Sequence, residues 1–276
     1  MENPTPATVE NQLFTRFVAG RQDEQQWLFL NGFNNGDPQT NGEFRLLALC
    51  APHSALLLDI GYNEGLVSTE FRRLNPAVRV LGFEPNPAMP SQPTPDQLVR
   101  LALSDTSDAA ARFLIHRKNS GVSSLNERTQ MNPSFRKDFD SFEVRVERLD
   151  ELYAELAPTP CPTFMKIDVE GSDARVIRGS ERFFSERSPV GYFEYSLGWK
   201  ESGERFQDLF YHLDALEYAL YRVTPLGLEH LRYFHQTMED YRYQNIFFAP
   251  SGWLDRLIRP LSVPTGTSQT AFYRFP

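Results

Sequence analysis

LLLDIGYNEGLVSTEF, residues 56–71, joins a fully apolar run to a turn that holds Asp59, Gly61 and Gly65, and then to a helical pattern. A buried strand, a glycine turn and a helix in this order are typical of nucleotide-binding sites in α/β proteins. Glycine allows such a turn because it adopts conformations that other residues avoid. The segment therefore predicts a nucleotide-type cofactor, and it leaves NAD, ATP and S-adenosylmethionine as candidates.

The spacing of the glycines separates these three candidates. A dinucleotide site would have G-x-G-x-x-G, but Asn63 stands where the middle glycine is needed. A phosphate-binding loop would continue with Gly-Lys-Ser/Thr, which does not follow Gly65. The pattern Asp59-x-Gly61-x-x-x-Gly65 is instead found in S-adenosylmethionine-dependent methyltransferases. That cofactor has no pyrophosphate and carries positive charge, so a nearby carboxylate stabilises it.

Acidic residues after the next two expected strands support this interpretation. Glu84 lies 25 residues after Asp59 and ends the strand Val78–Phe83, where it can accept hydrogen bonds from two ribose hydroxyls. Pro85, the next residue, is included among the cofactor-binding residues. Ser104 and Asp105 follow a third strand, and Asp105 is expected to accept from the adenine amino group. The alternatives are a surface acid at Glu84 and a plain turn-former at Asp105.

The composition of the 276 residues argues against several classes of partner and of protein. A net charge of −8 argues against a duplex nucleic acid as partner, since phosphate binding needs a clustered positive surface. Cys50 and Cys161 are far apart, which predicts neither a disulfide framework nor a metal site. The N-terminus lacks the pattern of a signal peptide, and no run approaches the ~18 apolar residues of a membrane span. We expect a cytoplasmic chain with no membrane partner.

Strands and helices alternate along most of the chain, which predicts a doubly wound α/β sheet. We expect an N-terminal helical extension (1–53) with helices at Val9–Leu30 and Glu43–Cys50, a catalytic domain (54–250), and a tail (251–276) with little to bury. The period-two pattern over Ala109–Val146 predicts an antiparallel insertion. Further strands are expected at Ala55–Ile60, Leu98–Leu103, Pro162–Val169 and Pro189–Ser196. A hairpin is expected to join Ala219–Val223 and Asn245–Ala249. Helices are expected at Glu64–Leu74, Leu149–Leu156, Asp173–Phe184 and Phe206–Leu220.

Five short motifs between Leu56 and Glu194 resemble those of the FkbM-type methyltransferases. They are DIGYNEG (59–65), FEPNP (83–87), ALSD (102–105), RLDEL (148–152) and MKIDVEG (165–171). The resemblance implies the Rossmann-like class I methyltransferase fold with a mostly parallel seven-stranded sheet. It also implies S-adenosylmethionine as methyl donor and O-methylation of a small molecule such as a sugar or polyketide. Tyr62 departs from the family pattern, where a small residue is usual, so we expect Tyr62 and Asn63 at the rim of the cofactor site.

The MKIDVEG motif supplies the candidate catalytic residues. Asp168 and Glu170 follow a strand that should lie beside the first one, at the edge where ligands bind. Either could act as general base or hold the acceptor hydroxyl, and Asp168 could also contact the cofactor; alternatively, either could cap the next helix. His116, at the end of an insertion strand, is a further candidate base, and the loop Gly121–Leu125 is expected to cover the cofactor.

A metal ion is not expected, although Glu194 could pair with Asp168 to hold one. Two other functions stay open: an N- or carboxyl-methyltransferase acting on a peptide or protein, and a cofactor-binding protein without catalysis. The residues that choose the acceptor should lie in the N-terminal extension, the insertion and the connection Leu226–Tyr243, whose sequences carry no readable code.

Overall fold

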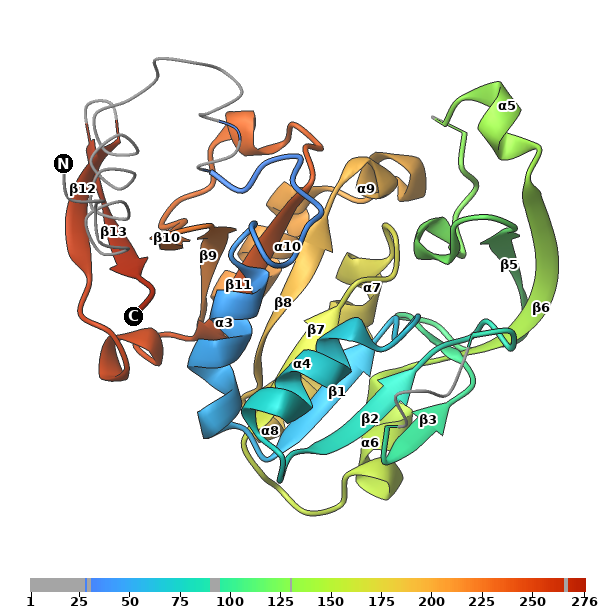
Figure 1. The fold of residues 1–276 in the computed structure, drawn as a ribbon, viewed down its shortest axis with the longest axis horizontal. Coiled ribbons are helices and arrows are strands. Elements are labelled where there is room, and N and C mark those ends of the chain that lie inside the picture. The colour runs from blue at the N-terminus through green and yellow to red at the C-terminus, as the bar shows by residue number, and fades with distance from the viewer. Residues whose placement is uncertain (1–27, 29–30, 90–94, 130, 266–267) are drawn as a thin grey trace, which may run out of the picture.

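A ten-stranded mixed sheet forms the centre of the molecule (Figure 1), in the order β12-β13-β10-β9-β11-β8-β7-β1-β2-β3. The computed structural model describes residues 28, 31–89, 95–129, 131–265 and 268–276. The helix expected at Val9–Leu30 therefore lies outside the described residues, apart from Leu28. No helix in the described part of the chain has both the length and the apolar character that a membrane crossing requires.

Five neighbouring strands of this sheet are parallel, as the alternating pattern predicts. The chain order reverses at β1, because β2 and β3 lie on one side of it and β7 and β8 on the other. Such a reversal opens a crevice at the carboxyl ends of the strands, where ligands of α/β sheets bind. The five strands are β3 (Gln97–Val99), β2 (Arg79–Phe83), β1 (Leu56–Ile60), β7 (Thr163–Ile167) and β8 (Val190–Tyr195).

The sheet is larger than the seven strands expected. β11 (Gln244–Pro250) is antiparallel to both β8 and β9 (Tyr218–Thr224), which confirms the hairpin partners. The tail, expected to bury little, instead forms β12 (Leu261–Thr265) and β13 (Ser268–Arg274). β13 pairs with β10 (Gly227–His230), and Phe272, Tyr273 and Phe275 are buried. Burial of these aromatic rings accounts for the extra strands.

Helices cover both faces of the sheet, as in a doubly wound protein. α3 (Glu43–Cys50) and α4 (Leu66–Leu74) pack on the face toward the viewer in Figure 1, within one apolar cluster. A second cluster fills the other face, beneath five helices. These are α6 (Leu149–Leu156), α7 (Asp173–Arg178), α8 (Glu181–Arg187), α9 (Leu197–Ser202) and α10 (Phe206–Ala215).

Two expected helices are shorter than the sequence pattern suggested. The segment Asp173–Phe184 is divided between α7 and α8 at Gly179, where a Cβ atom would lie 1.9 Å from the carbonyl oxygen of Ser104. The helix expected to reach Leu220 ends at Ala215, and Glu217 takes a left-handed conformation (φ 64°) before β9 begins. In both places a tertiary contact or the sheet overrides the local helical pattern.

The antiparallel insertion is present as a separate three-stranded sheet at the right of Figure 1. β5 (Asp108–His116) and β6 (Phe139–Glu147) are antiparallel, and β4 (Ala102–Leu103) pairs with β6. The strand expected at Leu98–Leu103 is therefore two strands in two sheets. The connection between β5 and β6 contains the 3-10 helix η2 (Ser120–Val122) and the short helix α5 (Pro133–Arg136). It approaches the carboxyl ends of the strands of the main sheet.

Candidate functional site

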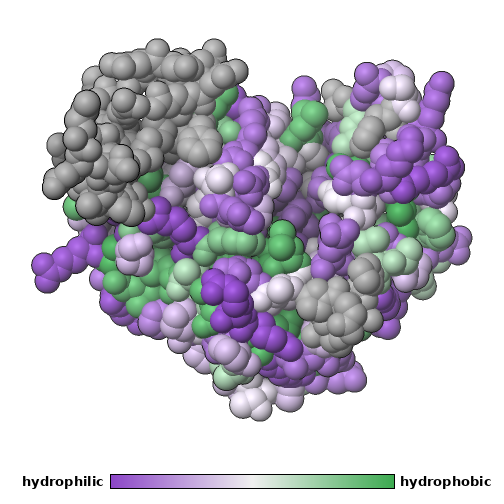
Figure 2. Space-filling model, viewed as in Figure 1, coloured by the Kyte–Doolittle hydropathy of each residue, from purple (hydrophilic) through white to green (hydrophobic). Residues whose placement is uncertain are grey.

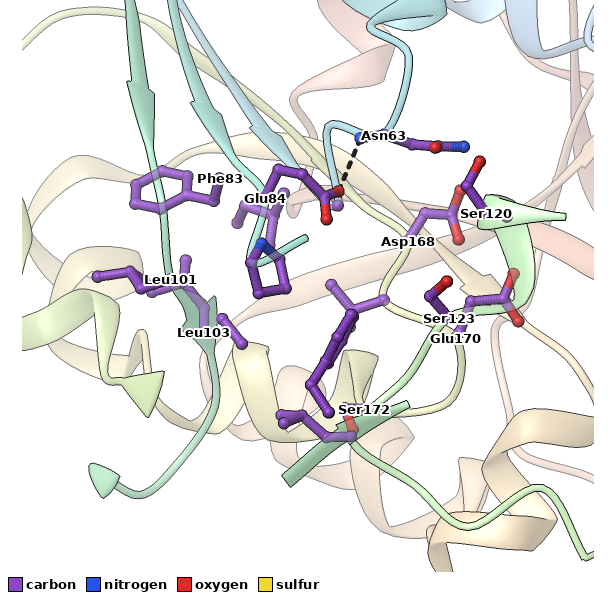
Figure 3. Close-up of a pocket in the computed structure, with 18 residues that line it drawn as sticks. Asn63, Phe83, Glu84, Leu101, Leu103, Ser120, Ser123, Asp168, Glu170 and Ser172 are labelled. Carbon is purple, nitrogen blue, oxygen red and sulfur yellow. Dashed lines mark hydrogen bonds between the residues drawn. The ribbon is translucent and has the colours of Figure 1, made fainter. Parts of the chain in front are cut away.

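A cleft of about 600 Å³ lies at the carboxyl ends of β1, β2 and β7, at the point where the strand order reverses (Figure 3). One end is apolar and the other carries carboxylates and hydroxyls. The lining residues are Ile60, Gly61, Asn63, Phe83, Glu84, Pro85, Leu101, Ala102, Leu103, Phe113, Ser120, Gly121, Ser123, Leu125, Asp168, Val169, Glu170 and Ser172.

The Gly61 turn holds the floor of the cleft. Gly61 has φ +79°, and a Cβ atom there would lie 1.9 Å from the carbonyl oxygen of Asp168. The turns that follow β1 and β7 are therefore in direct backbone contact, which only glycine permits. Lys166 Nζ donates a hydrogen bond to the Gly61 carbonyl oxygen at 2.5 Å and fixes this arrangement from below.

Glu84 lines the cleft where the sequence placed it, directly after β2. Its two carboxylate oxygens accept the backbone N–H groups of Asn63 (2.9 Å) and Asn86 (2.8 Å). Burial raises the pKa of Glu84, while these hydrogen bonds oppose the increase. A carboxylate offers about four acceptor positions, so Glu84 can accept two further hydrogen bonds from hydroxyls of a ligand.

Two polar atoms of the cleft wall are buried without a hydrogen-bond partner among the described residues. They are Asn63 Oδ1 and Ser123 Oγ. Leaving such an atom unpaired costs about 1–3 kcal/mol, so both positions favour a polar ligand. Ser123 belongs to the loop Gly121–Leu125, which lies over the cleft as the sequence predicted.

Asp59 does not face the cleft, contrary to the expectation that it contacts the cofactor. It is 1% exposed, accepts a hydrogen bond from Ser68 Oγ (2.5 Å) and lies 3.4 Å from Lys166 Nζ. Burial raises the pKa of Asp59 and Lys166 opposes the increase. Because Asp59 is within β1 rather than after it, strand alternation turns its side chain away from the turn.

Tyr62 is not at the rim either, although Asn63 is. The Tyr62 ring is 2% exposed and packs beneath the turn, between Gly65 and Gly82. A Cβ atom at Gly65 would lie 2.2 Å from Tyr62 Oη, and one at Gly82 would lie 2.8 Å from the ring. Gly65 (φ +72°) therefore makes room for an aromatic ring, and this ring occupies the place that the family pattern gives to a small residue.

Ser104 and Asp105 also lie outside the cleft lining. The backbone N–H of Ser104 donates to the Glu147 carbonyl oxygen, and its hydroxyl is 3.3 Å from Asp105. Asp105 forms an ion pair with Arg178 of α7 at 3.1 Å. Asp105 therefore does not line the cleft, because an arginine of α7 pairs with its carboxylate, and its adenine contact stays a prediction. Pro85 does line the cleft, as expected.

Three carboxylates gather at the other end of the cleft. Single oxygen atoms of Asp168, Glu170 and Glu194 all lie within 4.8 Å of one another, so the group could hold a metal ion. Burial, and then the charges of Asp168, Glu170 and Asp173, raise the pKa of Glu194 well above its ordinary value. Asp168 lies 3.6 Å from Lys166 Nζ. The expectation that no metal is needed stays a prediction.

Arg128 holds Glu170 in place. Its guanidinium donates to Glu170 Oε2 at 2.6 Å and lies 3.1 Å from Glu201, and the Arg128 side chain is only 2% exposed. Burial raises the pKa of Glu170 to about 7, although Arg128 opposes the increase. Sequence reasoning missed Arg128 and Glu201, because an isolated arginine in a polar loop has no pattern that connects it to a residue 42 positions away.

His116 is not in the cleft, contrary to the expectation that it overhangs the pocket as a base. It is 4% exposed, its ring packs edge-on against Phe139, and Nδ1 accepts the backbone N–H groups of Lys118 and Asn119. These contacts direct the ring toward its own loop. Asp168 and Glu170 are therefore the predicted catalytic residues that the structure brings to the cleft.

The family follows from comparison with known proteins. The model of the methyltransferase FkbM domain matches residues 59–223, more than half of the chain. The chain belongs to this FkbM family. It is an S-adenosylmethionine-dependent methyltransferase, which confirms the resemblance and the cofactor inferred from the motifs. No curated protein matches it in sequence.

Three solved structures are similar to the chain at low sequence identity. Methyltransferase FkbM from Methylobacillus flagellatus KT is 15% identical, with a TM-score of 0.45; the match covers 87% of this chain and 59% of that one. The O-methyltransferase TomG from Streptomyces achromogenes is 11% identical (TM-score 0.42; 88% and 96% covered). An O-methyltransferase from Bacillus cereus is 14% identical (TM-score 0.40; 90% and 92% covered). The chain thus spans less than two thirds of the FkbM structure's length.

Proposed function

We propose that the protein transfers a methyl group from S-adenosylmethionine to a hydroxyl oxygen of a small molecule, with Glu170 as general base. The observation that carries this proposal is the position of Glu170. Glu170 lines the cofactor cleft and also a second cavity behind it, so it lies where the two reactants would meet. With a pKa of about 7, set by burial, Glu170 is poised to accept a proton near neutral pH.

The cleft residues support one arrangement of the cofactor. Phe83, Leu101 and Leu103 form the apolar end, which suits the adenine ring (Figure 3). Glu84 is placed to receive the two ribose hydroxyls. Gly61 and Asn63 would then lie beside the methionine part, and Asp168 beside the positively charged sulfur.

The bound cofactor supplies a methyl group activated by a sulfonium. Glu170 takes the hydroxyl proton of the acceptor as the oxygen–methyl bond forms and the methyl–sulfur bond breaks. The products are the methyl ether, neutral S-adenosylhomocysteine and protonated Glu170. Arg128 keeps Oε2 of Glu170 occupied, and Oε1 carries no hydrogen bond within the described chain, so Oε1 is the atom placed to accept the proton.

Two measurements test this function separately. Calorimetry with S-adenosylhomocysteine tests the cofactor cleft, and Glu84→Ala should weaken the binding. Transfer of a labelled methyl group to a panel of alcohols, phenols, carboxylic acids and amines tests the chemistry. Alkali-resistant ether products are expected. Methyl esters or N-methyl products would show that the acceptor atom is different and would overturn the O-methyltransferase proposal.

A further inference from the structure

A second cavity of about 980 Å³ lies behind Glu170 and reaches the three carboxylates at the end of the cofactor cleft. Glu170 lines both spaces, so a molecule in the second cavity would meet the cofactor cleft at that carboxyl. Its wall includes Arg128, Glu170, Glu194, Leu197, Tyr241 and Tyr243. It therefore has the position that an acceptor site must have.

Several wall residues of this cavity come from chain segments outside the five motifs. Asn34 belongs to the segment before α3, Met131 to the insertion between β5 and β6, and Tyr241 to the connection between β10 and β11. These segments lie far apart in the sequence and meet at this cavity. In Figure 2 the outline of the molecule is notched between the insertion and the rest of the chain. A site built from connecting segments on a rigid scaffold is where substrate selection is expected.

The charges of the cavity are largely paired with one another. Arg128 lies between Glu170 and Glu201, and Arg242 lies 3.6 Å from Asp240. An anionic acceptor would therefore have to displace an existing ion pair, which is costly in a partly buried site. Glu194 has no ion-pair partner in the described residues, and one of its oxygens lies within 4.8 Å of oxygens of Asp168 and Glu170. Its carboxyl is therefore placed at the polar end of the cavity, where it can form a hydrogen bond with a hydroxyl.

The rest of the wall is suited to a ring. Leu197 is 45% exposed at the start of α9 and is one of the few large apolar side chains with so much surface open. Met131, Tyr241 and Tyr243 line the same cavity. Aromatic and sulfur-containing side chains pack well against flat rings. The carboxyl groups of Glu170 and Glu194 provide the polar end.

We propose that this cavity binds the methyl acceptor and that the acceptor is an aromatic ring compound with a hydroxyl and no anionic group, with its ring against Leu197, Tyr241 and Tyr243 and its hydroxyl between Glu170 and Glu194. The proposal rests on the proposed function, because it names the substrate class for that same site.

The test measures binding of small fragments to the protein saturated with S-adenosylhomocysteine, by saturation-transfer NMR. The fragments are 4-methylumbelliferone (an uncharged hydroxylated ring), methyl glucoside, phenethylamine and benzoate. Leu197→Trp fills the cavity from its exposed wall, and Leu261→Trp is the matched control, since Leu261 is 43% exposed on β12 and is not part of the cavity wall. We expect 4-methylumbelliferone to bind, and Leu197→Trp to weaken it about tenfold or more while Leu261→Trp changes it by less than about twofold.

Preferential binding of phenethylamine or benzoate would overturn the substrate class, and so would the failure of 4-methylumbelliferone to bind. A preference for methyl glucoside would place the hydroxyl on a sugar rather than on an aromatic ring and would also overturn it. Equal binding to the two tryptophan variants would overturn the location. Loss of S-adenosylhomocysteine binding in the wild type would instead contradict the proposed function, so the two failures are distinguishable.

Discussion

Replacing Glu170 by glutamine keeps the side chain's size and an oxygen that can accept from Arg128, but it removes the proposed base. General base catalysis contributes roughly 10²–10⁴-fold, so kcat should fall by that factor. The cofactor cleft should be nearly unaffected, because the adenine and ribose positions lie at its other end. Affinity for S-adenosylhomocysteine should therefore change by less than about threefold in calorimetry.

The pH dependence of the reaction rate tests the role of Glu170 more directly. Burial raises the pKa of Glu170 to about 7, the charge of Arg128 opposes this, and Asp168 adds to it. Because the base must be ionised, the wild-type rate should rise about tenfold per pH unit below pH 7 and level off above it. Lys166 and Glu194 are the other charged groups that face this carboxyl. Glu170→Gln should show no such rise.

The same pKa predicts how stability depends on pH. The ordinary pKa of the Glu170 carboxyl is 4.5, so between 4.5 and about 7 the folded state binds more protons than the unfolded state. Stability should therefore decrease as pH rises through this interval, by about 1–3 kcal/mol from this residue alone. Urea unfolding at pH 5 and pH 8 should show a smaller difference for Glu170→Gln than for the wild type.

The control is Glu151→Gln, which removes an exposed carboxylate on α6 and should change neither the rate nor its pH profile. If Glu170→Gln kept the wild-type kcat together with a rise in rate near pH 7, another group would be the base. The reasoning from the position of Glu170 between the two cavities would then be refuted.

Three further substitutions test the cofactor cleft and its surroundings. Glu84→Ala removes the acceptor of two backbone N–H groups and of the proposed ribose contacts, and should weaken S-adenosylhomocysteine about tenfold to a hundredfold in calorimetry; an unchanged affinity would contradict that placement. Asp105→Asn should leave this affinity within about twofold, since Asp105 pairs with Arg178 outside the cleft, and a large loss would restore the adenine contact predicted from sequence. Gly65→Ala places a Cβ atom 2.2 Å from Tyr62 Oη and should lower Tm by roughly 3–10 °C. Adding Tyr62→Leu should recover part of that loss, and no recovery would mean that the ring is not the obstacle.

The parallel part of the sheet and the position of the cleft could be predicted because their signals are local. An apolar run followed by a glycine turn marks the end of β1, and an acidic residue marks the end of β2 and of β7. Each of these strands is buried on both faces, which produces an unbroken apolar run. The tail was different: its three buried aromatic residues, Phe272, Tyr273 and Phe275, stand in a short segment without a clear period, and pairing with β10 helps to bury them.

The roles of individual acidic residues could be predicted only where the chain has already left the strand. Glu84 and Asp168 come directly after β2 and β7, and both line the cleft. Asp59 is still within β1, so its direction is set by strand alternation, and it points to the buried side. The loss of Asp105 from the cleft depends on Arg178, 73 residues away, and no pattern in the sequence indicates that pairing.

The inward direction of Asp59 also explains why the family motif pairs it with a lysine two residues before Asp168. In the register of β1 and β7, Asp59 is opposite Lys166, and the lysine ammonium reaches Asp59 (3.4 Å), Asp168 (3.6 Å) and the Gly61 carbonyl oxygen (2.5 Å). Burial disfavours the charge of Lys166, but the surrounding carboxylates raise its pKa, so it stays a cation. One buried ammonium thus joins the two turns that form the floor of the cleft. Asp59 therefore contacts Lys166 rather than the cleft, and the carboxylates that line the cleft are those beyond the strand ends.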